Sequence, residues 1–167
     1  MTIDFIKHKD ISESMLQEIC VIKKQHWDYS VKEHIAWMNC NLSDSDTHLI
    51  LRETESGGIT GYMNLVNLDV VVDGKSVKMI GVGNVCVSTN CQGNKYGLLL
   101  MKIAEYFLQK RNMNGILLCK EKQIPFYERV RWYRYPYVIK IGKDTFDNVV
   151  YMCNEVSSNE IILDRNF

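Results

Sequence analysis

The apolar residues near the start of the chain recur with the period of a helix. Asp10 followed three residues later by Glu13 is a capping-box pattern, and it predicts a helix of about four turns. The apolar residues that set the period are Ile11, Met15, Leu16, Ile19 and Ile22. Ser30 and Glu33 repeat the capping signal, so we expect a second, shorter helix that ends near Asn39.

Runs of β-branched and aliphatic residues follow from Thr47 onward. A strand is also expected at the start of the chain, from Thr2, where polar and apolar residues alternate. The three later strands are predicted over His48–Glu53, Ile59–Val72 and Ser76–Ser88. Asp73-Gly74 separates the last two, which is a strong signal for a hairpin between antiparallel strands.

The segment from Leu98 to Lys110 has the pattern of a mostly buried helix. Its polar residues Lys102, Glu105 and Gln109 form one narrow stripe, and the other positions are mostly apolar. Asn114-Gly115 is predicted to end this helix, because these residues tolerate the backbone conformation that follows a last turn. A short buried strand, Ile116–Cys119, is expected next.

The last third of the chain predicts one brief helix and two strands. Ile124–Val130 is long enough for a short helix, and Pro125 is tolerated in its first turn. Strand-like runs follow at Tyr133–Ile141 and Asn148–Cys153, the first interrupted by Pro136, which indicates an edge or a bulge. The element order predicts an α/β (α+β) fold in one domain over residues 1–167, with a mixed, mostly antiparallel sheet flanked by helices.

Composition and charge exclude several classes of protein. Twenty Lys and Arg balance twenty Asp and Glu, so the chain lacks the positive charge expected of a nucleic-acid-binding protein. No run approaches the roughly 18 apolar residues of a membrane span, and the first ten residues do not resemble a secretory signal. The six cysteines contain no C-x-x-C pair, and the histidines have no metal-ligand spacing. We therefore expect a cytoplasmic protein with reduced thiols and no metal.

The segment Gln92-Gly93-Asn94-Lys95-Tyr96-Gly97 lies between an apolar strand and the predicted buried helix. A glycine-bearing turn at a helix N-terminus directs unpaired N–H groups towards an anion such as a phosphate, although glycines there can also serve only a tight turn. It is not a P-loop, because Leu98 and Leu99 follow the second glycine in place of Lys and Ser/Thr. Gly81-Val82-Gly83 does not fit a dinucleotide fingerprint either, since the third glycine position is Cys86.

Two motifs in this chain resemble those of the GNAT superfamily of N-acetyltransferases. The first is the loop pattern of Gln or Arg, two residues, Gly, one residue, then Gly or Ala, in which Gln92 and Gly97 match the ends. The second is a Phe-Tyr pair on a short helix before a Gly-aromatic pair, matched by Phe126-Tyr127 and Trp132. The sequence departs from the family at Lys95 and Arg131, where relatives usually carry glycine.

The resemblance implies an acyl-CoA donor, namely acetyl-CoA, bound between two splayed parallel strands. The backbone of the strand end is implied to bind the pantetheine arm, and the loop with the first helical turn to bind the pyrophosphate. The donor-binding residues so implied are Val85, Cys86, Val87, Gln92, Gly93, Asn94, Lys95, Tyr96, Gly97 and Leu98. Tyr127 matches the general acid of the family, and a phenol can donate a proton at neutral pH without special tuning.

The function that follows from this resemblance is transfer of an acetyl group from acetyl-CoA to a primary amine by direct attack in a ternary complex. Two alternatives stay open: a longer acyl-CoA or acyl carrier protein as donor, and a non-catalytic module that senses acyl-CoA. The general base is not assigned, with Glu53 and Asp69 as candidates. Cys119 has no identifiable partner base, so we expect no cysteine nucleophile. The acceptor and the oligomeric state, a homodimer included, are left open.

Overall fold

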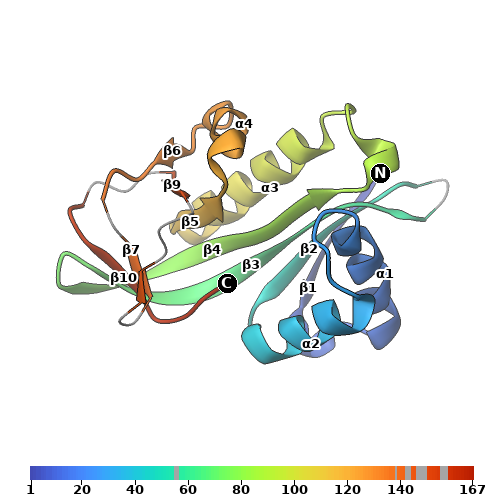
Figure 1. Cartoon of the computed structure of the whole chain (residues 1–167), viewed down its shortest axis with the longest axis horizontal. Helices are drawn as coiled ribbons and strands as arrows, with labels where there is room; N and C mark the ends of the chain where they lie inside the picture. Colours follow the sequence, from blue (N-terminus) through green and yellow to red (C-terminus); the bar gives the residue numbers. More distant parts are fainter. Residues whose placement is uncertain (55–56, 138, 142–143, 146–149, 155–157) are drawn as a thin grey trace. The chain divides into compact units, whose positions relative to one another are not determined.

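A computed structural model of the chain describes residues 1–54, 57–137, 139–141, 144–145, 150–154 and 158–167 (Figure 1). The described helices are α1 Glu13–Lys24, α2 Val31–Asn41, α3 Tyr96–Arg111 and α4 Ile124–Glu128, with short 3₁₀ turns at His8–Asp10, Thr89–Cys91 and Glu121–Gln123. The described strands are β1 Thr2–Lys7, β2 Thr47–Arg52, β3 Ile59–Val72, β4 Lys75–Val87, β5 Asn114–Cys119, β6 Tyr133–Arg134, β7 Ile139–Ile141, β8 Asp144–Thr145, β9 Val150–Cys153 and β10 Ile161–Leu163.

These strands form one mixed sheet. Its main path runs β6-β9-β5-β4-β3-β10-β7-β8, while β2 pairs with β3 and β1 with β2. The chain divides into two compact units, Met1–Val66 with Gly83–Ile103 and Asn67–Val82 with Ala104–Phe167, and both β3 and β4 run through the two. The predicted fold class, a mostly antiparallel sheet flanked by helices, is confirmed.

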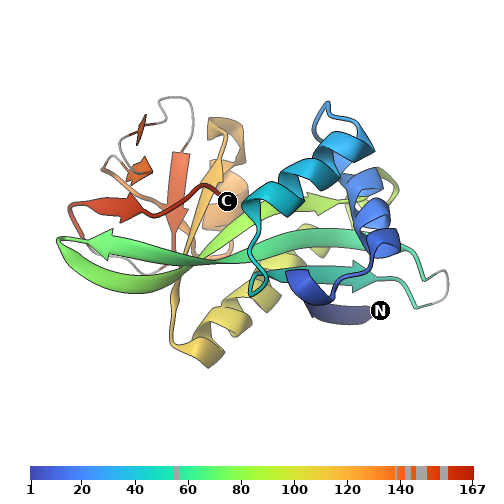
Figure 2. The same ribbon diagram turned by 90° about the horizontal axis from the view of Figure 1, so that it is seen from below.

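In the first unit, helices cover both faces of the antiparallel strands β1, β2 and β3 (Figure 2). The α1 and α2 helices lie together on one face, where Cys20 Sγ is 3.6 Å from Met38 Sδ. The start of α3 lies on the other face, where a Cβ at Gly61 would come within 3.0 Å of Leu100 Cδ1. The absence of a side chain at Gly61 therefore lets α3 approach the sheet closely.

The capping residue of α1 differs from the prediction. Asp10 belongs to a 3₁₀ turn, and Ile11 is extended, so the helix begins later, and Ser12 caps it by accepting a hydrogen bond from the Met15 N–H at 3.2 Å. The helix is thus 12 residues long, shorter than the predicted four turns. The predicted capping box of Ser30 and Glu33 at the start of α2 is confirmed.

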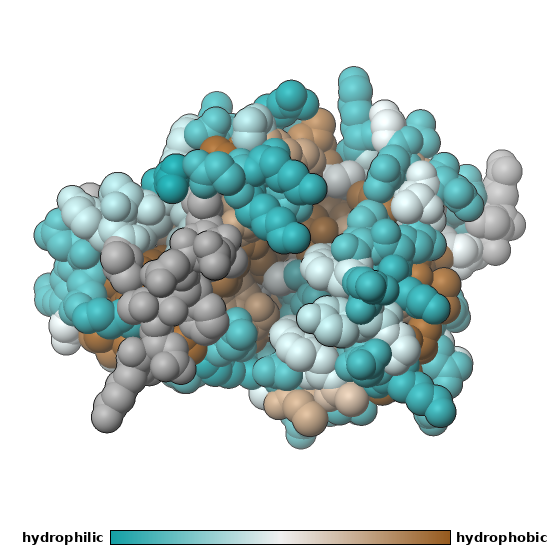
Figure 3. Space-filling model, in the orientation of Figure 1, coloured by the Kyte–Doolittle hydropathy of each residue, from teal (hydrophilic) through white to brown (hydrophobic). Residues whose placement is uncertain are grey.

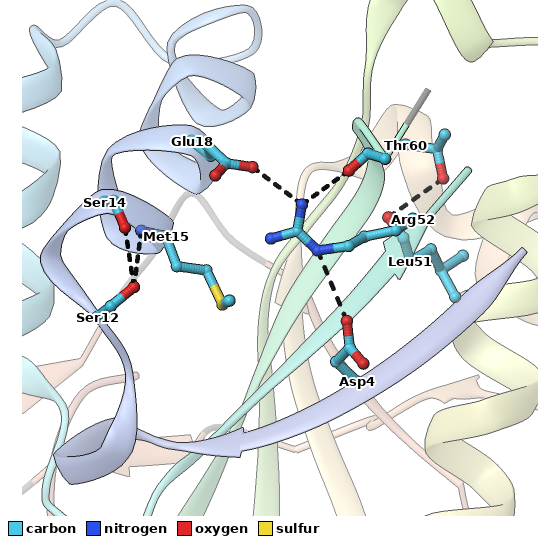
Figure 4. Close-up of polar contacts among 9 residues, drawn as sticks. Asp4, Ser12, Ser14, Met15, Glu18, Leu51, Arg52 and Thr60 are labelled. Atoms are coloured by element: carbon cyan, nitrogen blue, oxygen red, sulfur yellow. Dashed lines mark hydrogen bonds and ion pairs between the residues drawn. The ribbon is translucent and has the colours of Figure 1, made fainter. Parts of the chain in front are cut away.

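Arg52 connects three elements of the first unit (Figure 4). Its Nη1 donates to Glu18 Oε2 on α1 and to the Gly57 carbonyl, both at 2.9 Å, and its Nε lies 3.6 Å from Asp4 Oδ2 on β1. This pairing fixes the exposed side of α1 to the edge of the sheet. The surface over α1 and α2 is mostly hydrophilic, as expected for helices that bury only one face (Figure 3).

In the second unit, β5 lies between a parallel and an antiparallel neighbour. Met79–Gly81 of β4 pairs in parallel with Asn114–Ile116, and β9 pairs antiparallel along the other side of β5. A Cβ at Gly115 would lie 2.4 Å from Trp132 Cη2. The glycine is therefore needed for close packing of the indole.

The prediction that Asn114-Gly115 ends the preceding helix is wrong, because both residues belong to β5. The helix stops at Arg111, and Asn112, with φ of 50°, follows it.

The turn between β3 and β4 is the predicted hairpin. Asp73 and Gly74 both have positive φ, 46° and 77°, as the two central residues of a type I′ turn require. The Asp73 carboxylate also accepts hydrogen bonds from the N–H groups of Asn159 and Glu160, both at 2.9 Å. The side chain thus holds the hairpin to the segment that leads into β10.

The last predicted strands differ most from the structure. The run Tyr133–Ile141 is divided into β6 and β7, which pair with different neighbours, β9 and β10. Pro136 lies between them, and it has no N–H for a continuous ladder. The sequence patterns also missed β8 and β10, which are two and three residues long. Val138, Asn148 and Val149, which belong to the predicted runs, lie outside the described residues.

Candidate functional site

The candidate donor site is the segment that joins β4 to α3 in the first unit. The Ser88 N–H donates to the Thr60 carbonyl at 2.9 Å, which holds the end of β4 to β3, and the 3₁₀ turn Thr89–Cys91 follows. The carbonyl of Lys95 accepts from the Leu99 N–H at 3.0 Å and so begins the α3 ladder. Helical geometry leaves the first N–H groups of α3 without an intrahelical acceptor, and they can bind an anion.

The predicted donor-binding residues are brought together as one continuous segment. Cys86 is buried, and its neighbours Val85 and Val87 are partly exposed. The predicted loop residues from Gln92 to Lys95 are exposed, while Tyr96, Gly97 and Leu98 are partly exposed in the first turn of α3. The segment therefore presents backbone and side chains to solvent at the strand end and at the helix N-terminus.

The two departures from the family pattern share one backbone property. Lys95 has φ of 62° and Arg131 has φ of 63°, in the left-handed region that glycine adopts without a steric penalty. At both positions a residue with a side chain thus adopts a backbone conformation that favours glycine. For a residue with a Cβ this conformation costs about 1–2 kcal/mol.

We predict that glycine and alanine at position 95 will have different effects on stability. Lys95→Gly relieves the left-handed strain and should raise the free energy of unfolding by about 0.5–1 kcal/mol, whereas Lys95→Ala keeps it. Both variants remove the ammonium. If it contacts a CoA phosphate, both should lose about 1–2 kcal/mol of acetyl-CoA binding at low salt, and less at high salt.

Urea unfolding and calorimetric titration with acetyl-CoA measure these two effects. Arg131→Gly is the matched control, because it relieves the same strain in the second unit and should leave acetyl-CoA affinity unchanged. Wild-type affinity in Lys95→Ala at low salt would show that the lysine is tolerated and is not a ligand.

Two residues just after α1 hold the donor segment in place, and the sequence patterns did not identify either. The Gln25 Oε1 accepts from the Thr89 N–H at 2.8 Å and from the Thr89 hydroxyl at 3.2 Å. The His26 Nε2 donates to the Val87 carbonyl at 2.7 Å. A carbonyl oxygen has two lone pairs, so Val87 can still accept a second hydrogen bond from a ligand.

We expect Gln25→Ala to weaken acetyl-CoA binding by about 3- to 10-fold, because it frees the start of the loop that must be ordered in the complex. Gln25→Glu keeps an oxygen acceptor and should retain most of the affinity. Gln17→Ala, on the exposed side of α1, is the control. Equal affinities in all three variants would mean that the contacts with Thr89 do not position the loop.

Tyr127 lies on α4 in the second unit and is 5% exposed. Its ring packs against Phe126 with the ring centroids 5.0 Å apart. Its carbonyl accepts from the N–H groups of Val130 and Trp132 at 3.0 and 3.2 Å, which closes the turn containing Arg131. The second sequence motif therefore forms a compact local structure that fixes the position of the tyrosine.

The buried cysteines stay protonated at neutral pH. Burial raises the pKa of the Cys86 and Cys153 thiols to about 12, and burial together with the nearby Glu121 carboxylate raises that of Cys119 to about 11. A thiol with such a pKa is a poor nucleophile, because the thiolate is the reactive species. This agrees with the expectation that Cys119 is not a nucleophile.

The candidate bases have ordinary surroundings. Asp69 is an exposed residue of β3 that forms an ion pair with Lys78. Glu53 is exposed directly after β2. Neither carboxylate is buried. A partly buried histidine pair also exists in the first unit, where His8 Nδ1 lies 3.0 Å from the Nε2 of the buried His48. Burial lowers the pKa of His48 to about 3.

Within the described ranges no group of three or more His, Cys, Asp or Glu side chains is arranged to hold a metal ion. None of the helices there combines the length and the apolar character that a membrane crossing requires.

Sequence comparison assigns the family. Residues 7–134 match the acetyltransferase (GNAT) domain, which covers well over half of the chain. The chain therefore belongs to the GNAT acetyltransferase family, as its two motifs predicted, and this places it among acyl-CoA-dependent acetyltransferases. A search of curated proteins gives no match.

Solved structures share the fold at low sequence identity. Escherichia coli ElaA is 15% identical with a TM-score of 0.66, and the match covers 92% of this chain and 99% of that one. An acyl-CoA N-acyltransferase from Pseudomonas aeruginosa is 16% identical with a TM-score of 0.67, covering 93% and 100%. A GNAT family acetyltransferase from Brucella melitensis, solved in complex with acetyl-CoA, is 17% identical with a TM-score of 0.61, covering 96% and 94%.

Proposed function

We propose that this protein, as one catalytic domain, transfers the acetyl group of acetyl-CoA to a primary amine. The observation that carries the proposal is the β4–α3 segment, where a partly exposed strand end leads through an exposed loop into the N-terminus of a 16-residue helix. Such a terminus favours a pyrophosphate through its free N–H groups and its dipole. The acetyl-CoA complex of the Brucella melitensis protein supports the choice of donor by analogy.

The proposed reaction is a direct attack of the amine nitrogen on the thioester carbonyl. A C–N bond forms, the C–S bond breaks, the amine loses one proton, and the CoA thiolate gains one. The N–H groups of Val85 to Val87 are proposed to bind the pantetheine arm and to polarise the carbonyl. The raised pKa values of the thiols of Cys86 and Cys119 argue against a covalent acyl-cysteine route.

Tyr127 is proposed to protonate the leaving thiolate, a role that the family resemblance assigns to it. Its buried and locally fixed ring supports this role, because a general acid must be held in one position. No carboxylate or imidazole occurs between Met79 and Val87. We therefore propose that the acceptor reaches the site as a neutral amine or loses its proton to water.

Native mass spectrometry with acetyl-CoA and with free CoA tests the donor. We expect one CoA per chain with either ligand, and a raised melting temperature at ligand concentrations well above the dissociation constant. Binding without turnover across a broad amine panel would favour the non-catalytic sensor, which the strained Lys95 and the missing strand carboxylate also suggest. Absence of both binding and thermal protection would contradict the proposed function.

A further inference from the structure

The first unit contains a lysine that is buried without a counter-charge. Lys23, in the last turn of α1, is 1% exposed. Among the residues that the structure describes, no carboxylate lies within ion-pair distance of its ammonium, whereas Arg52 on the same unit is paired with two acids. Buried charges in proteins are almost always paired, so an unpaired one is a candidate for ligand binding.

Four titratable groups that interact with this ammonium are neutral at physiological pH. Lys23 interacts electrostatically with the thiols of Cys20 and Cys86 and with the imidazoles of His34 and His48. Burial raises the pKa of both thiols and lowers that of both imidazoles, so none of them supplies a negative charge. His34 is itself buried, and its Nε2 has no hydrogen-bond partner. Within the described chain, an imidazole nitrogen without a hydrogen-bond partner thus accompanies an ammonium without a counter-charge.

Packing alone explains only part of this arrangement. The Lys23 Nζ lies 4.9 Å from the centroid of the Trp37 ring on α2, a cation–π contact. Such a contact recovers a fraction of the hydration that an ammonium loses on burial. A methionine would fill the same volume without this loss. The lysine therefore has a property beyond packing, which is a positive charge held in a buried site.

The location of the charge connects it with the proposed reaction. Cys86 lies between Val85 and Val87 on β4, the strand end on which the acyl donor is proposed to bind. His26, three residues after Lys23, donates a hydrogen bond to the Val87 carbonyl at 2.7 Å, so the end of α1 that carries Lys23 lies beside that strand end. A second substrate bound there would have its amine near the thioester.

We propose that Lys23 binds the carboxylate of the acceptor, so that the acceptor is an amino acid or a short peptide acetylated on its primary amine. This proposal rests on the proposed function. One ammonium carries one charge and three N–H donors, which suits a carboxylate and leaves a phosphate dianion only half neutralised. The ion pair forms in a site of low dielectric, where it is stronger than in water.

The test compares each amino acid and dipeptide with its own C-terminal amide as acceptor. The two differ in the charge of one group, so the ratio of their kcat/KM values isolates recognition of the carboxylate. We expect wild type to prefer the acids, and Lys23→Gln and Lys23→Met each to lower the acid-to-amide ratio by about 10- to 100-fold. Lys24→Met, an exposed neighbour on α1, should leave the ratio unchanged.

The outcomes separate this proposal from the proposed function. If wild type acetylates acids and amides alike, or if the ratio is the same in the Lys23 variants, the carboxylate site is wrong and acetyl transfer stands. If no amine is acetylated, the proposed function is wrong. The carboxylate site is then tested by the change in melting temperature when the same amino acids and their N-acetyl derivatives are added. No shift, or an equal shift in wild type and Lys23→Met, would then overturn the site. If Lys23→Gln does not fold, Lys23→Met still allows the comparison, because methionine removes the buried charge without adding a polar group.

Discussion

Replacing Tyr127 with phenylalanine should lower kcat by about 10- to 1000-fold, with little change in acetyl-CoA affinity or melting temperature. The substitution removes only the hydroxyl. The contact with the Phe126 ring and the two hydrogen bonds to the Tyr127 carbonyl do not involve it. A loss in kcat with folding and donor binding preserved would identify the hydroxyl as the proton donor to the thiolate.

The measurement is a rate profile from pH 6 to 9 under conditions where the chemical step limits turnover. Tyr133→Phe is the control, since Tyr133 is an exposed tyrosine on β6 of the same unit and should behave as wild type. A wild-type rate in Tyr127→Phe across this range would make Tyr127 a core residue only, and the acid would have to be sought elsewhere.

The unpaired charge of Lys23 should make stability depend on pH in a specific direction. Burial lowers the pKa of Lys23 from 10.5 to about 8, so between these values the unfolded chain binds a proton that the folded chain does not. Stability then rises with pH. Relative to Lys23→Met, the wild-type free energy of unfolding should rise by about 3 kcal/mol from pH 7 to pH 10.5.

Urea unfolding of wild type and Lys23→Met at several pH values measures this difference, and titrating groups that do not interact with Lys23 cancel in the comparison. Lys24→Met should run parallel to wild type, because Lys24 is exposed. A constant gap between wild type and Lys23→Met would mean that the pKa of Lys23 is not lowered, and that the charge is compensated in the folded protein.

Local patterns predicted the parts of the fold that local physics determines. The capping box at Ser30, the Asp73-Gly74 hairpin and the proline at the start of α4 each depend on residues a few positions apart, and all three are found. The segment from Gln92 to Leu98 was also found as a loop leading into a helix, because its glycines and the apolar pattern after it are adjacent in sequence.

Structural features that depend on contacts between residues far apart in the sequence were not predicted. The short β10 strand exists because β3 and β7 flank it, and nothing within three residues signals this. Gln25 and His26 reach the donor segment more than 60 positions away. From the sequence pattern, Lys23 is simply a polar residue near the end of a helix. It becomes buried only through the packing of α1 and α2 on the strands. The positive φ of Lys95 could not be predicted from the residue type either, because lysine rarely adopts this conformation.

The most direct test of the central claim is a product assay by mass spectrometry with acetyl-CoA and a panel of primary amines. The account predicts amine-dependent release of free CoA, formation of the N-acetylated amine in equal amount, and no acetylated enzyme intermediate. Thioester hydrolysis without an acetylated amine, or no consumption of acetyl-CoA with any amine although CoA binds, would contradict it.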